Sequence, residues 1–159
     1  NWELGTRDTG AYATMSDVKE YMCWLGKEFT KNKDSREQIK AAGAAIQDYE
    51  RKMTDALLHG LDNLKGLADF EDVEIIGGLN NSSREGLVSF RIKDQPSEKI
   101  VRYLNHQGIR THTRKCDHYS ENILIPLGWD DCVRVSICHY NTLSEIKKFL
   151  SCMAAFRDN

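Results

Sequence analysis

The sequence has no run of about 18 apolar residues, the length that a membrane-spanning helix needs. Its N-terminus also has no basic stretch followed by an apolar one, so no secretory signal is visible. These absences exclude a transmembrane helix and give no reason to expect export. We therefore expect a cytosolic domain with no membrane partner.

Neither sign of charge dominates the chain. The 22 Lys and Arg residues are nearly balanced by 24 Asp and Glu residues, which leaves a formal net charge of -2. A strongly basic surface is the usual electrostatic signature of binding to nucleic acid or to anionic lipid. The balance predicts neither partner.

The cysteines form no pair of the CxxC type. There are five of them, an odd number spread over the whole chain: Cys23, Cys116, Cys132, Cys138 and Cys152. This distribution argues against a disulfide framework and against a structural zinc site. At least one thiol is expected to be free.

What remains is the composition of an ordinary globular domain. Of the 159 residues, 40% are hydrophobic and 29% are charged, and there is neither an internal repeat nor a low-complexity tract. The chain begins at Asn1 and Trp2 without an initiator Met, inside what resembles a motif. We expect a single domain over residues 1–159 that belongs to a longer protein.

Apolar residues at helical spacing predict two helices in the first part of the chain. The first runs from about residue 16 to residue 29, with its stripe formed by Met15, Val18, Met22, Leu25 and Phe29. The second follows a capping box of Asp34 and Glu37 and ends at Gly60. It is a long helix.

From residue 73 the pattern changes to short β-rich runs. Strands are predicted over residues 73–76, 87–92, 109–113 and 132–138, with a helix between Pro96 and Gly108. A short helical stretch lies before the last strand, and Thr142 with Glu145 caps a final helix. This order predicts an α+β fold, a two-layer α/β sandwich in which helices cover one face of a small, mainly antiparallel sheet.

Residues 3–10 form the first of three segments with functional chemistry. Gly5 and Gly10 allow close backbone approach, and the hydroxyls of Thr6 and Thr9 with Arg7 precede a helix, an arrangement suited to phosphate. Gly- and Thr-rich turns before helices are also common without any ligand. The pattern leaves both interpretations open.

The second segment, residues 112–119, is predicted to be a loop after a strand. It places Cys116 among Arg114, Lys115, His112 and His118, and positive neighbours favour the nucleophilic thiolate. The alternative is a solvated loop with an incidental thiol. A metal site of His112, Cys116 and His118 has suitable ligand types, but the spacing matches no common zinc pattern.

The third segment places a charged residue in an otherwise apolar strand. Arg134 lies between Val133 and Val135, and its planar guanidinium suits a carboxylate, so it is a candidate anchor for an amino-acid substrate. Strand alternation is equally compatible with an Arg134 that points into water. The cysteines of predicted helices and strands are interpreted as small buried hydrophobes.

Taken in order, these segments resemble the C-terminal portion of class V aminotransferase-type enzymes, which include cysteine desulfurases and selenocysteine lyases. The resemblance covers nearly the whole chain. It rests on Glu-Leu-Gly-Thr at residues 3–6, on Gly-Ile-Arg-Thr at residues 108–111, and on Val-Arg-Val-Ser at residues 133–136 followed by His-Tyr-Asn-Thr at residues 139–142. The last of these is the most specific.

The resemblance implies the small domain of a fold-type I enzyme that uses pyridoxal 5'-phosphate. It assigns the cofactor phosphate, across a dimer interface, to Gly5, Thr6 and Thr9 within residues 1–15. It assigns substrate binding to Arg134 and Arg110. The lysine that holds the cofactor would precede this chain, so we expect the chain alone to be inactive.

The resemblance makes Cys116 the catalytic cysteine that takes sulfur from L-cysteine as a persulfide, with release of alanine. The longer enzyme would be a homodimer and would pass the sulfur to an acceptor protein. The loop lacks the family's Gly-His-His-Cys run, so an aminotransferase, epimerase or lyase without a persulfide step is the first alternative. A non-enzymatic α/β regulatory module is the second.

Overall fold

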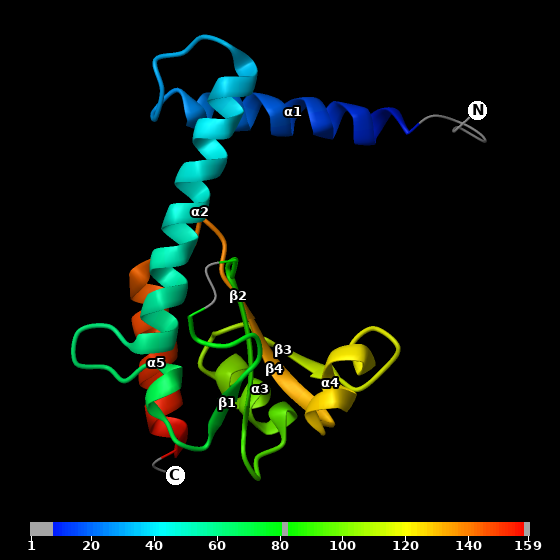
Figure 1. Ribbon diagram of the computed structural model, residues 1–159, viewed down its shortest axis with the longest axis vertical. Coiled ribbons are helices and arrows are strands. Elements are labelled where there is room, and N and C mark those ends of the chain that lie inside the picture. The colour runs from blue at the N-terminus through cyan, green and yellow to red at the C-terminus, as the bar shows by residue number, and fades with distance from the viewer. Residues whose placement is uncertain (1–7, 81–82, 158–159) are drawn as a thin grey trace. The chain divides into compact units, whose positions relative to one another are not determined.

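The structure is a computed structural model that describes residues 8–80 and 83–157 and forms two compact units, Asn1–Asp48 and Tyr49–Asn159 (Figure 1). The candidate residues Gly5 and Thr6 lie outside the described residues. No helix in the described ranges is both long and apolar enough to cross a membrane.

The first unit contains helix α1 (Thr9–Gly26) and the start of helix α2 (Ser35–His59). Helix α1 begins earlier than predicted because the Asp8 carboxylate caps it, accepting a hydrogen bond from the Ala11 N–H at 3.0 Å. At its end, Gly26 lies against the backbone of α2: a Cβ there would stand 1.9 Å from the Gln38 carbonyl oxygen. Only glycine allows the two helices to approach this closely.

Much of the predicted apolar stripe of α1 is exposed. Met15 is 65% exposed and Val18 is 47% exposed, and the neighbouring Trp24 is 59% exposed. Three large apolar side chains in contact with water on one helix are characteristic of a surface that another part of a protein covers.

The second unit contains the remaining elements. They are the 3₁₀ helix η1 (Leu67–Asp69), strands β1 (Val73–Ile75), β2 (Leu87–Ile92), β3 (His112–Lys115) and β4 (Asp131–Ser136), and helices α3 (Ser97–His106), α4 (Glu121–Leu127) and α5 (Leu143–Arg157). The strands form one antiparallel sheet in the order β1-β2-β4-β3. This confirms the predicted α+β class.

One face of the sheet carries the core. Val88 and Phe90 of β2 and Val133 of β4 are completely buried, and they pack with apolar residues of α2, α3 and α5 (Figure 1). Phe90 meets Phe149 of α5 edge-on, with ring centroids 6.5 Å apart. A smaller apolar cluster lies on the other face, where Leu124 of α4 packs with Trp129 and Cys132.

The third strand begins three residues later than the sequence predicted. Gly108 has a φ of 73°, and the Ile109 N–H closes the end of α3 by bonding to the Leu104 carbonyl at 2.9 Å. Residue 109 is therefore committed to the helix cap and cannot pair in the sheet. The chain joins β4 only from His112, and much of the predicted loop over residues 112–119 is strand β3.

The fourth strand ends two residues earlier than predicted. The Cys138 N–H bonds to the Asn141 side chain at 2.9 Å, which turns the chain toward the final helix. That helix starts as predicted: the Thr142 N–H donates to the Glu145 carboxylate at 2.7 Å, and Thr142 Oγ1 accepts from the Glu145 N–H at 3.4 Å.

Candidate anion-binding pocket

The side chains that do not face the core line the opposite surface of the sheet, called the open face below. In the antiparallel register, Arg134 of β4 lies between Ser89 of β2 and His112 of β3, and Arg114 of β3 lies opposite Cys132. Directly opposed residues point to the same face. Strand pairing thus gathers polar and basic side chains from three strands.

Four of these side chains, those of Ser89, Arg114, Cys132 and Arg134, line a pocket of about 300 Å³ that α4 partly covers. Its lining residues are Ile76, Arg84, Leu87, Ser89, Arg114, Ser120, Ile123, Leu124, Cys132 and Arg134. Three of them are arginines and none is an acidic residue. A concave site with this charge suits a small anion such as a carboxylate.

Arg134 has an unused hydrogen-bond donor in this pocket. Its Nε is buried and has no hydrogen-bond partner, and no ion pair to it is found in the described ranges. Arg91, two positions from Ser89 on the same face of β2, differs: its guanidinium pairs with Glu74 and lies 4.4 Å from the centre of the Trp129 ring. The Nε of Arg84, in the same pocket, is likewise buried without a partner, so unpaired donors are found in this pocket but not at every arginine on the open face.

Arg84 has a structural task at the rim of the pocket. It donates to the carbonyls of Ile76 at 2.7 Å, Gly78 at 2.6 Å and Leu87 at 3.1 Å. Burial lowers its pKa from the usual arginine value. Since its donors bind the backbone on both sides of the β1–β2 connection, Arg84 holds that connection beside the pocket.

Cys132 is a pocket residue that the sequence interpretation treated only as a buried hydrophobe. Its side chain is buried between Arg114 and the small apolar cluster of Leu124 and Trp129. Burial raises the pKa of this thiol, and the nearby Asp131 adds to the rise, while a hydrogen bond with Ser89 opposes it. The raised pKa disfavours the reactive thiolate at this position.

Cys116 follows β3 directly and is exposed. Its N–H donates to the Asp130 carbonyl at 2.8 Å, which continues the β3–β4 ladder by one residue and places the side chain on the same side as Arg114. Cys116 does not line the pocket of Arg134. The structure therefore brings Cys116 to the open face but not into direct contact with that pocket.

The other predicted site residues lie elsewhere. Thr9 is the first residue of α1, after the cap Asp8. Arg110 lies between α3 and β3, is exposed, and does not line the pocket of Arg134. Within residues 8–80 and 83–157, no group of three or more His, Cys, Asp or Glu side chains could hold a metal ion.

Fold and pocket together define an α+β domain with an arginine-lined pocket on the open face of its sheet. The family model for class-V aminotransferases matches residues 37–149, more than half of the chain. The chain belongs to this family.

Two curated relatives are both described as probable cysteine desulfurases. The protein from Treponema pallidum (strain Nichols) is 28% identical over 109 residues, which cover 67% of this chain and 26% of the relative. The protein from Borreliella burgdorferi (strain ATCC 35210 / DSM 4680 / CIP 102532 / B31) is 34% identical over 88 residues, 55% of this chain and 20% of the relative. The chain thus spans about a quarter of the length of these relatives.

Solved structures show the same fold. An apo cysteine desulfurase from Thermococcus onnurineus NA1 has a TM-score of 0.63 at 24% identity, covering 77% of this chain and 28% of that one. A NifS-like protein from Rickettsia africae ESF-5 has a TM-score of 0.57 at 16% identity, covering 79% and 33% respectively.

Proposed function

We propose that this chain is the C-terminal small domain of a pyridoxal-phosphate enzyme of the cysteine desulfurase type, and that Arg134 binds the α-carboxylate of its amino-acid substrate. The observation that carries the proposal is the pocket on the open face, where the Nε of Arg134 is buried without a partner and the described lining residues include no acidic side chain. A substrate carboxylate would supply the missing acceptor.

Pyridoxal phosphate, when bound, acts as an electron sink for an amino acid. The contribution of this chain is recognition. Arg134 would fix the carboxylate and so orient the substrate, with Arg114 adding positive charge beside it, while Leu124 and Ile123 of α4 exclude water from that side. The cofactor lysine would belong to a part of the protein outside this chain, which is consistent with the share of the relatives that the chain spans.

The exposed apolar side chains of α1 support this arrangement. Met15, Val18 and Trp24 would be covered by the cofactor-bearing part of the longer enzyme or by its dimer partner. Gly5, Thr6 and Thr9 would reach the cofactor phosphate, as the family resemblance implies. L-Cysteine is the proposed substrate because both curated relatives are described as probable cysteine desulfurases.

In the longer enzyme, the substrate test is a measurement of alanine and sulfide formed from L-cysteine. Arg134→Gln should raise KM far more than it lowers kcat, because a lost carboxylate contact weakens substrate binding first. Arg91→Gln is the matched control on the same face and should leave KM unchanged. An Arg134→Gln enzyme with the KM of the wild type would overturn the proposal.

A reaction without a persulfide is the alternative that one observation favours, since Cys116 does not line the pocket of Arg134. In the desulfurase, the exposed Cys116 thiolate would attack the substrate sulfur and break the carbon–sulfur bond, leaving a Cys116 persulfide and a carbon that is protonated to give alanine. A thiol reductant added to the assay would then release the outer sulfur as sulfide. Cys116→Ser should then abolish sulfide release while leaving carboxylate binding intact. Unchanged sulfide release in Cys116→Ser would remove the persulfide role and leave a lyase, whereas an aminotransferase or an epimerase would release no sulfide from either protein.

A further inference from the structure

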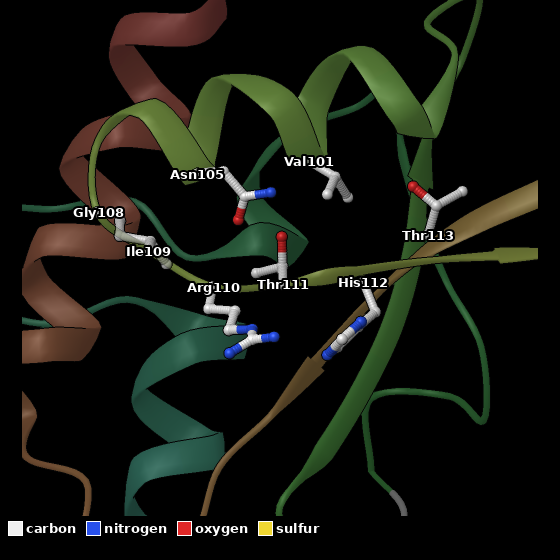
Figure 2. Close-up of a pocket in the computed structure, with 8 residues that line it drawn as sticks. All are labelled: Val101, Asn105, Gly108, Ile109, Arg110, Thr111, His112 and Thr113. Atoms are coloured by element: carbon white, nitrogen blue, oxygen red, sulfur yellow. The ribbon is translucent and has the colours of Figure 1, made fainter.

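A second hollow, separate from the pocket of Arg134, lies between helix α3 and the outer edge of strand β3 (Figure 2). It measures about 620 Å³ and is lined by Val101 and Asn105 of α3 and by residues 108–113. We call it the β3-edge groove. None of these described lining residues is acidic.

The backbone of β3 offers unused hydrogen-bonding groups to this groove. The bond from the Cys116 N–H to the Asp130 carbonyl shows which residues of β3 face β4, because bonded and non-bonded pairs alternate in an antiparallel ladder. Cys116, Arg114 and His112 face β4, so the N–H and C=O of Thr113 point outward. Strand β3 is at the edge of the sheet, where such groups can pair with an added strand.

A buried hydroxyl in the groove also lacks a partner. Thr111 is only 4% exposed, and its Oγ1 has no hydrogen-bond partner. Figure 2 shows this hydroxyl pointing toward α3, with the Asn105 side chain on the opposite side of the same space. A buried hydroxyl without a partner costs free energy that a ligand group would recover.

The charge of the edge indicates the kind of segment that would bind. Arg110, His112, Arg114 and Lys115 lie along it, and residues 108–116 contain no Asp or Glu. Figure 2 shows Arg110 and His112 directed away from α3. A second copy of this strand would place like charges opposite each other, which destabilises strand pairing. An acidic strand would be attracted.

We propose that the β3-edge groove binds an extended acidic segment of a partner protein, which adds to β3 as a fifth strand. Its backbone pairs with Thr113. Alternate side chains carry a hydroxyl or amide toward Thr111 and Asn105, and the intervening acidic side chains lie beside His112 and Arg114. Strand addition of this kind takes affinity from backbone bonds and specificity from alternate side chains.

The probe is the peptide acetyl-Glu-Thr-Glu-Thr-Glu-amide, titrated into this chain while amide hydrogen exchange is followed by NMR. Thr113 should exchange rapidly in the free chain and about a hundredfold more slowly at a peptide concentration of about 100 times Kd. Arg114, whose N–H already bonds to β4, should not change. This contrast between adjacent residues distinguishes strand addition from a general rise in stability.

Two control peptides separate the backbone contribution from the charge contribution. A peptide of the same charge, N-methylated at the residues that would pair with Thr113, should lose protection at Thr113. A peptide with Gln in place of Glu should bind up to about tenfold more weakly, since attractions of modest size between opposite charges are removed. Equal protection by the N-methylated peptide would overturn strand addition.

Thr111→Val tests the buried hydroxyl without touching the backbone. It should abolish the preference for the Thr peptide over its Ala analogue, whereas Thr54→Val, which removes another buried hydroxyl without a partner, should leave it intact. Arg134→Met should bind the peptide as the wild type does, so the result is independent of the proposed enzyme function. Loss of peptide binding in Arg134→Met would contradict the proposal and show that the peptide binds in the substrate pocket. Protection of Thr113 that rises with the concentration of the chain alone would contradict it in favour of self-association.

Discussion

Replacing Arg134 with Met should make the folded chain more stable, although most substitutions of buried side chains destabilise. Met keeps most of the apolar length of the arginine side chain and removes the buried Nε that has no partner. An unsatisfied buried donor costs about 1–3 kcal/mol. The substitution also removes a positive charge from a pocket that contains Arg84 and Arg114.

After an allowance for lost packing, we expect a net gain of about 1 kcal/mol, which for a unit of this size raises Tm by roughly 3–5 °C. Urea and thermal denaturation measure the change. Arg91→Met is the matched control, with the opposite sign: it breaks the pair with Glu74 and the contact with Trp129, at a cost of about 1 kcal/mol.

A loss of 1 kcal/mol or more in Arg134→Met would refute the reasoning, because it would show that Arg134 has a stabilising partner in the folded chain. A side chain whose donors are all hydrogen-bonded within the folded chain has none left for a substrate. The expected gain in stability at the expense of a binding function is the usual trade-off at functional sites.

Four further predictions concern other residues. Cys116, which is exposed, should react with a maleimide in the native state much faster than Cys132, whose pKa is raised by burial. Mass spectrometry of the labelled peptides identifies the site. Equal rates would contradict the packing around Cys132. Thr142→Ala should lower the free energy of unfolding by about 1 kcal/mol through loss of the α5 cap. The bonds from Thr142 lower the pKa of Glu145. The stabilisation from this carboxylate is therefore fully present above its unfolded pKa of about 4.3 and is lost as pH falls through the folded pKa. The difference in unfolding free energy between wild type and Glu145→Gln, measured against pH, should shrink on acidification. Arg84→Met should speed amide exchange around Gly78 and Leu87 and destabilise by about 1 kcal/mol, because the carbonyls of these two residues lose a charged donor. Unaltered exchange would show that Arg84 does not hold the connection.

The sequence predicted most of the fold because local signals and tertiary packing agree. Asp34 and Thr142 cap helices where expected, and the alternation of apolar residues in β2 and β4 matches the buried face. The errors in the predicted elements lie at the ends of helices and strands. One example is a residue that was predicted to begin a strand but belongs to the cap of the preceding helix. Ile109 has the character of a strand residue, but its N–H belongs to the cap of α3.

The pocket was harder to predict because its members are far apart in the sequence. Arg134 stood out as a charge in an apolar strand, but the contribution of Ser89 and Arg84 depends on the pairing of β2 with β4. Which of the two polar environments Arg134 would meet, water or a pocket, depends on the packing of α4. Strand alternation alone could not distinguish them.

The most direct test of the account is the NMR signal of the Arg134 Nε–H during a titration of this chain with L-alanine, with alaninamide as the control that lacks a carboxylate. Carboxylate binding predicts a saturable shift of this signal with L-alanine and none with alaninamide, while the Arg91 signal stays constant. A signal that does not move with L-alanine, or that moves equally with both compounds, would contradict the assignment of Arg134 as the carboxylate anchor.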